Sequence, residues 1–237
     1  MRDWAAILGL PLWAWLFVFP SVFVLICAFR PKGLRGFLRP IWAVLDRLYL
    51  AAGIIAAAFM TLILLIIVGQ MIARWTGLTF QGSTEFAGYA MAATSFFAFA
   101  HALTRGAHIR VSIFLNLNNF TRLWLDAVAM WIAALTATYF ARYAVKTNFF
   151  SEMLNDRTQG QDQVPEWLLS LVAMLGTWPW NWAELWANTS DKWVFTPVWL
   201  PQLPMSVGTI LLAIALWDML ARHLLDRQTP ITSEALV

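Results

Sequence analysis

Five long stretches of this chain contain no charged side chain, and they restrict its possible folds more than any other feature. They cover residues 4–29, 48–73, 86–104, 127–141 and 193–217. An α-helix needs about 20 mostly apolar residues to cross the hydrocarbon core of a bilayer. The chain is 60% hydrophobic and only 12% charged, and it contains 15 tryptophans. This composition excludes a soluble enzyme domain, a disordered chain and a disulfide-stabilised secreted module. The sequence predicts an all-α polytopic membrane protein.

Four of these stretches predict a four-helix transmembrane core, and the expected helices cover residues 48–73, 86–104, 123–146 and 204–225. The third helix is extended beyond its uncharged stretch on the premise that Asp126 and Arg142 lie near the two interfaces. The fourth is expected to begin only after Pro204, because Pro197, Pro201 and Pro204 disfavour helix before that point.

The first stretch, residues 4–29, is long enough to span a membrane, although Pro11 and Pro20 should kink it. Basic residues follow it rather than precede it, and no small-residue cleavage site is present, so it does not have the pattern of a signal peptide. We favour an extra N-terminal membrane helix over a helix that lies in the interface.

A second stretch, residues 167–183, is short and rich in tryptophan, and Gly176 and Pro179 interrupt it. Glutamates flank it on both sides. These properties favour one or two interfacial helices over a membrane span.

The charged residues predict an orientation. Ten of the 16 basic residues fall in residues 30–47, residues 105–122 and the C-terminal tail, which an even number of core helices separates. Residues 147–203 contain six acids and two basic residues. Because basic residues in short loops stay in the cytoplasm, we expect a cytoplasmic C-terminus and a periplasmic segment over residues 147–203.

The sequence offers few residues that could be catalytic or bind a cofactor or a metal. His101 is the one ionisable residue well inside an expected span, where such residues are functional candidates, although a hydrogen bond to a neighbouring helix is the commoner role. Cys27 is the single cysteine. No nucleotide-binding, nucleophile or metal-ligand motif occurs. We therefore expect no catalytic residue, no cofactor, no metal and no nucleic-acid partner, and a membrane scaffold that serves a partner protein.

Two alternatives stay open at this point. A haem- or quinone-associated membrane anchor of a respiratory enzyme is the second candidate function, although only His101, His108 and His223 are available as haem ligands. The small residues Gly88, Ala92 and Ser95 form a face that either packs within the bundle or contacts another subunit.

One block of residues has a family resemblance. Glu85 opens a helix, about twenty apolar residues follow, and then comes Arg105-Gly106-Ala107-His108-Ile109-Arg110-Val111. This block resembles the motif that joins the second and third helices of the small membrane subunit (DctQ-like) of TRAP transporters, the tripartite ATP-independent periplasmic family. The resemblance covers residues 46–225.

The resemblance implies a non-catalytic small permease subunit in the bacterial inner membrane. Its implied partners are a large TRAP membrane subunit, a periplasmic solute-binding protein and membrane lipids. The implied process is uptake of a small solute, an organic acid, by symport with an ion, during which the small subunit braces the large one. The family-motif residues implied to contact a partner or lipid are Glu85, Arg105, Gly106, His108 and Arg110.

The expected organisation has three parts. Residues 1–45 form the N-terminal membrane helix and a basic cytoplasmic segment, residues 46–225 form the four-helix core, and residues 226–237 form a cytoplasmic tail. A periplasmic insertion at about residues 147–203 interrupts the core and is longer than the resemblance implies. Its tryptophans either help to dock the solute-binding protein or rest on lipid.

Overall fold

Four helices long and apolar enough to cross a membrane lie in the structure, which is a computed structural model that describes residues 6–29, 31–105, 119–187 and 189–226. They are α2 (Pro31–Trp75), α3 (Ser83–Thr104), α4 (Asn119–Met153) and α7 (Trp199–Asp226). The prediction of an all-α polytopic membrane protein with a four-helix core is confirmed.

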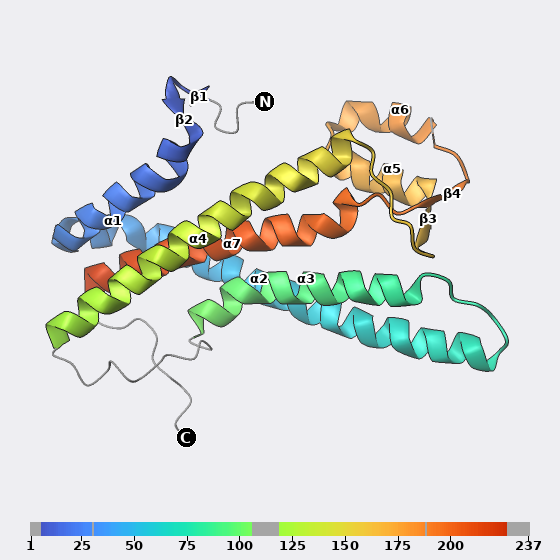
Figure 1. Cartoon of the computed structure of the whole chain (residues 1–237), viewed down its shortest axis with the longest axis horizontal. Coiled ribbons are helices and arrows are strands. Elements are labelled where there is room, and N and C mark those ends of the chain that lie inside the picture. The colour runs from blue at the N-terminus through green and yellow to red at the C-terminus, as the bar shows by residue number, and fades with distance from the viewer. Residues whose placement is uncertain (1–5, 30, 106–118, 188, 227–237) are drawn as a thin grey trace.

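The last helix, α7, is the centre of the bundle (Figure 1). It packs against α4 along its length and also contacts α3, α2 and α1 (Phe19–Phe29). In its most apolar window 56% of the residues are buried, whereas the corresponding value for α2 is 11%. The core around α7 consists largely of alanines, including Ala52, Ala100, Ala134 and Ala215. Small side chains allow helix backbones to approach closely where lipid supplies no hydrophobic driving force.

The helix α2 is longer than the sequence predicts. It runs for 45 residues without interruption, so the basic residues that were expected to precede a helix at residue 48 belong to the helix itself. Pro31 is compatible with a first helical position, and the leucines and arginines that follow are good helix formers. Arg35 of this extension donates from Nη2 to the carbonyl oxygen of Leu225 at 3.5 Å, which ties it to the end of α7.

The start of α7 also corrects the prediction. The helix begins at Trp199 and includes Pro201 and Pro204, although these prolines were expected to exclude helix. Pro201 lies in the first turn and loses nothing, because the amide hydrogens there have no partner within the helix. Pro204 lies inside the helix, where it removes one intrahelical hydrogen bond.

In place of the expected extra N-terminal membrane helix over residues 4–29, the structure has a short apolar helical stretch, Ala14–Phe29. A hairpin of β1 (Ala6–Ile7) and β2 (Leu10–Pro11) turns at Leu8 and Gly9, whose φ angles are 52° and 81°. The π-helical turn η1 (Ala14–Val18) and α1 follow, and together they are shorter than a membrane span. This short helix packs on α7 and α4, where Trp131 Nε1 donates to Ser21 Oγ at 3.1 Å.

Between α4 and α7 the chain folds into a small unit, residues 154–198, which we name the cap. It contains β3 (Gln163–Pro165), α5 (Glu166–Leu175), the 3₁₀ turn η3 (Pro179–Asn181), α6 (Trp182–Ala187) and β4 (Trp193–Phe195). The strands β3 and β4 pair antiparallel with Val164 opposite Val194. The helices predicted for this segment are therefore present, and Figure 1 places them at the end of the bundle that carries the α2–α3 turn.

Candidate functional site

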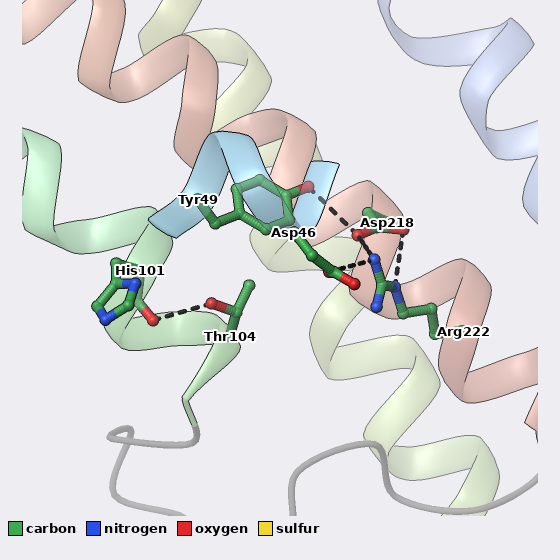
Figure 2. Close-up of polar contacts among 6 residues, drawn as sticks. All are labelled: Asp46, Tyr49, His101, Thr104, Asp218 and Arg222. Carbon is green, nitrogen blue, oxygen red and sulfur yellow. Dashed lines mark hydrogen bonds and ion pairs between the residues drawn. The ribbon is translucent and has the colours of Figure 1, made fainter. Parts of the chain in front are cut away.

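An ion-pair cluster joins the two helices α2 and α7 near the end of the bundle opposite the cap (Figure 2). Arg222 donates from Nη2 to Asp46 Oδ1 at 2.7 Å and from Nε to Asp218 Oδ1 at 3.0 Å. The Tyr49 hydroxyl donates to Asp218 Oδ2 at 3.2 Å. The guanidinium also lies 5.3 Å from the ring centroid of Trp42. One arginine of α7 thus connects to three side chains of α2, directly or through Asp218.

The burial of this cluster determines its energetics. Tyr49 is 2% exposed, and the Asp218 side chain is 4% exposed, whereas that of Asp46 is 56% exposed. A buried carboxylate is costly unless it is paired and hydrogen-bonded. Asp218 has both kinds of partner, so the cluster is a packing site that fixes α2 against α7, and Asp46 contributes little because solvent screens it.

His101 occupies a tight contact between α3 and α2. A Cβ added to Gly53 would lie 2.7 Å from Cγ of the His101 ring, so only glycine fits at that position. The His101 carbonyl oxygen accepts from Thr104 Oγ1 at 2.9 Å and from the Arg105 amide at 3.1 Å. The His101 ring thus packs against the α2 backbone, whereas the sequence favoured a hydrogen bond to a neighbouring helix.

A second polar cluster ties the cap to the first turns of α3. The Tyr89 hydroxyl donates to Asp162 Oδ2 at 2.6 Å, and Thr158 Oγ1 donates to Asp162 Oδ1 at 2.9 Å. The Asp162 carbonyl oxygen accepts from the Thr196 hydroxyl at 2.6 Å. Asp162 is fully buried. Burial alone would raise the pKa of its carboxyl, but the hydrogen bonds from Tyr89 and Thr158 outweigh burial and hold that pKa below its ordinary value.

Two glycines make this contact possible. A Cβ on Gly82 would lie 2.8 Å from the Asp162 Cα, and Gly82 has a φ of +75° that favours glycine. A Cβ on Gly160 would lie 2.8 Å from Asp162 Oδ1 and 3.1 Å from Glu85 Oε1. The cap therefore approaches the start of α3 at a distance that side chains would prevent.

Acidification should loosen the cap. Because the folded-state pKa of Asp162 is lowered, its stabilising contribution is complete above the unfolded value of about 4 and is lost as the pH falls below it. Hydrogen exchange of the Thr158 and Thr196 amides, corrected for intrinsic rates, should therefore accelerate as the pH is lowered from about 5 to about 3. This range contains the pKa of an aspartate in the unfolded chain. Asp162→Asn should remove this pH dependence and Asp191→Asn, at an exposed acid of the cap, should keep it. An unchanged dependence in Asp162→Asn would contradict this assignment.

Two of the five family-motif residues lie in the described part of the chain, and they are not close together along the bundle. Glu85 lies at the start of α3, where its Oε1 accepts from the Gln161 amide at 3.2 Å. Arg105 follows the other end of α3, and its side chain is exposed. Gly106, His108 and Arg110 lie outside the described residues, so their roles stay predictions.

The Asp162 cluster has no signal in the sequence, since no local pattern links Tyr89 to a residue 73 positions later. The Asp218–Arg222 pair had a local signal, the i, i+4 spacing of opposite charges on one helix. Within the described ranges, no three His, Cys, Asp or Glu side chains gather in a way that could hold a metal ion. His223 is buried, and its Nε2 lies 3.1 Å from the Leu123 carbonyl oxygen.

Residues 63–178 match the family model described as "Tripartite ATP-independent periplasmic transporters, DctQ component". The matched segment, which is just under half of the chain, belongs to the DctQ family. The comparisons with curated proteins and with solved structures gave no match.

The matched DctQ region begins inside α2, includes all of α3 and α4, and ends after α5. It therefore contains the contact of Tyr89 with Asp162 and Thr158, but no residue of the ion-pair cluster between α2 and α7. Membership makes the chain a small permease subunit of a TRAP transporter and a multi-pass protein of the inner membrane. DctQ components function in a tripartite system with a large membrane subunit and a solute-binding protein.

Proposed function

We propose that this chain braces the large membrane subunit of a TRAP transporter while that subunit takes up a small organic acid by symport with an ion. The solute-binding protein delivers the solute, and the chain itself performs no chemistry. The match to the DctQ component over residues 63–178 carries this proposal. It is supported by a bundle in which three long helices pack around the fourth, α7, and a wide apolar face of α2 stays exposed.

A specific face of α3 suits contact with the large subunit. Gly88 and Ser95 are exposed and Ala92 is half-buried, and a Cβ on Gly88 would meet nothing within 4 Å. The alanines Ala90, Ala93 and Ala100 on the other side of α3 are buried in the bundle. We infer that the small-residue face of α3 is an intersubunit contact, because small residues allow a partner helix to approach closely.

The orientation and organisation follow the charge distribution. We propose that the C-terminus and the Arg105–Arg110 motif face the cytoplasm, with His108 and Gly106 at a surface that contacts lipid phosphate or the partner. Glu85 and the cap then face the periplasm, where the solute-binding protein arrives. The proposed parts are residues 1–45, 46–225 and 226–237, with the insertion at about 147–203, and α2 continues across the first boundary.

Co-expression with the large subunit and the solute-binding protein tests the proposal. Uptake of a labelled organic acid should require this chain, and tagged chain should co-purify with the large subunit. Gly88→Val should reduce the co-purified large subunit at least tenfold, which corresponds to about 1.4 kcal/mol, while the isolated chain stays folded. Phe140→Val, at an exposed residue of α4, is the control and should not reduce it. Uptake at full rate without this chain would overturn the proposed function.

A further inference from the structure

Two short helices of the cap, α5 and α6, form a hairpin. They run antiparallel, since the Thr189 hydroxyl donates to Ser170 Oγ at 2.7 Å. The Ser190 hydroxyl donates to the carboxylate of Glu166 and closes the base of the hairpin. In Figure 1 the turn between α5 and α6 points back toward the bundle, and the ends of the hairpin that join β3 and β4 point away from it. We name residues 176–182, which form this turn, the hairpin tip.

Large apolar side chains cover the hairpin tip. Trp178 and Trp180 are 69% and 75% exposed, and their rings stack with the centroids 5.3 Å apart. Trp182 at the end of the tip and Trp186 on α6 are exposed as well. Between residues 167 and 187 the sequence has a single charged residue, Glu184. An exposed apolar surface of this kind marks a contact with a protein or with a membrane.

The backbone of the hairpin tip is hydrogen-bonded within the hairpin. Trp182 Nε1 donates to the carbonyl oxygens of Met174 and Thr177 at 2.9 Å and 3.3 Å. The Trp178 carbonyl oxygen accepts from the Asn181 amide at 3.0 Å. The last carbonyl groups of a helix have no partner within the helix, so the Trp182 indole takes the place of water at the end of α5. The tip is therefore suited to surroundings in which water is scarce.

The base of the cap lies at one surface of the membrane. Asn148 Nδ2, near the end of α4, donates to the carbonyl oxygen of Trp199, the first residue of α7, at 2.9 Å. Glu85 bounds the uncharged stretch of α3 and accepts from the Gln161 amide at 3.2 Å. The helix α5 begins at Glu166, shortly after Gln161, and its 10 residues are about 15 Å long. Because the hairpin turns back toward the bundle, its tip stays close to the headgroup layer around the ends of these helices.

Exposed apolar residues also lead from the spanning helices into the cap. Phe149, Met153 and Leu154, at the end of α4 and the start of the cap, are all exposed. A protein contact usually surrounds its apolar centre with a polar rim, whereas Glu184 is the sole charged residue of the hairpin beyond its base. Tryptophan rings are enriched at the level of lipid headgroups. These properties favour a lipid surface over a protein partner.

We propose that the hairpin tip inserts into the headgroup layer of the leaflet on the cap side of the membrane. The rings of Trp178 and Trp180 reach about 5–10 Å into the boundary between headgroups and acyl chains. The tip has no basic residue, so its insertion does not depend on anionic lipid. The cap is then held at two points, by the contact of Asp162 with α3 and by the hairpin tip in the bilayer. This inference rests on the membrane-spanning bundle and not on a role in uptake.

Spin labels measure the depth of the tip in full-length chain reconstituted in vesicles of phosphatidylethanolamine and phosphatidylglycerol. The background is Cys27→Ala, because Cys27 is the single cysteine. One label is attached at Asn181→Cys, in the tip, and another at Asp191→Cys, an exposed acid near the base of the hairpin. Each label is tested for collision with oxygen, which concentrates in the bilayer, and with a water-soluble nickel chelate. The oxygen-to-nickel ratio should be higher at residue 181 by about fivefold or more, and vesicles of phosphatidylcholine alone should give the same result.

Tryptophan substitutions test what holds the tip in the bilayer. Trp178→Ser combined with Trp180→Ser should lower the ratio at residue 181 at least threefold. Trp193→Ser, at an exposed tryptophan of β4 outside the hairpin, is the matched control and should leave the ratio unchanged. Circular dichroism and size-exclusion chromatography establish that the variants are folded.

Each other outcome contradicts part of the proposal. Equal ratios at residues 181 and 191 would overturn the insertion. An unchanged ratio in the double variant, or an equal loss in Trp193→Ser, would overturn the role of the tip tryptophans. A label at residue 181 that is accessible to the nickel chelate, and that becomes protected when the solute-binding protein is added, would assign the tip to that protein instead.

Discussion

Replacing Arg222 with leucine is expected to destabilise the folded chain by about 3–5 kcal/mol, the cost of leaving a buried carboxylate without its charged partner. Asp218 is 8% exposed, and Arg222 is its only cationic partner among the ion pairs that the structure shows. The loss should appear as a lower midpoint in mixed-micelle denaturation followed by circular dichroism. It should also appear as a smaller yield of monodisperse protein.

Substitutions at neighbouring residues distinguish the stability cost of an unpaired charge from the cost of lost packing. Asp46→Asn should cost less than about 1 kcal/mol, because this carboxylate is half exposed and screened by solvent. Adding Asp218→Asn to Arg222→Leu should recover most of the loss, since a neutral amide still accepts from Tyr49 and leaves no buried charge. If the double variant is as unstable as Arg222→Leu alone, the unpaired charge is not the cause.

Gly208→Val is expected to prevent α7 from packing on α3. A Cβ at this position would lie 2.5 Å from the Phe96 carbonyl oxygen and 2.6 Å from its carbonyl carbon. These are backbone atoms of a helix, so they cannot move aside as a flexible side chain can. Overpacking a rigid site costs up to about 3 kcal/mol and occasionally more, and we expect the upper end of that range. Thermal unfolding in detergent should show a clear decrease in the midpoint.

Gly88→Val is the matched control for Gly208→Val, because both glycines lie within spanning helices and a Cβ on Gly88 meets nothing within 4 Å. The isolated chain should tolerate this change with little loss of stability. Gly208→Ala should fall between wild type and Gly208→Val, since it adds only the Cβ. Equal midpoints for Gly208→Val and Gly88→Val would show that α7 does not approach α3 as closely as the structure has it.

The membrane helices were predictable because hydropathy is a local property. A span of about 20 apolar residues has few alternatives in a bilayer, and all four expected spans are present. Their ends were less predictable. The extension of α2 to Pro31 and the start of α7 at Trp199 depend on how prolines and charges are accommodated near the interface, where both helix and loop are hydrated.

The polar contacts were not predictable from composition or periodicity. Tyr49 and Asp218 are 169 residues apart, and their contact depends on the rotation of two helices about their axes. The same holds for the contact between Tyr89 and Asp162. The family motif around Arg105 identified the chain without identifying these contacts, since it lies at a different end of α3 from the cap.

The central position of α7 has a consequence for biogenesis. Translation proceeds from the N-terminus, so α2, α3 and α4 are synthesised before the helix that they all pack against. In the described part of the chain, α4 has extensive contact with α7 and very little with α2 or α3. The α2–α3 hairpin and α4 therefore have little contact to hold them together until α7 has been synthesised. Nonsense mutations between residues 154 and 198 therefore remove the central helix of the bundle, even though they leave the three earlier spans complete.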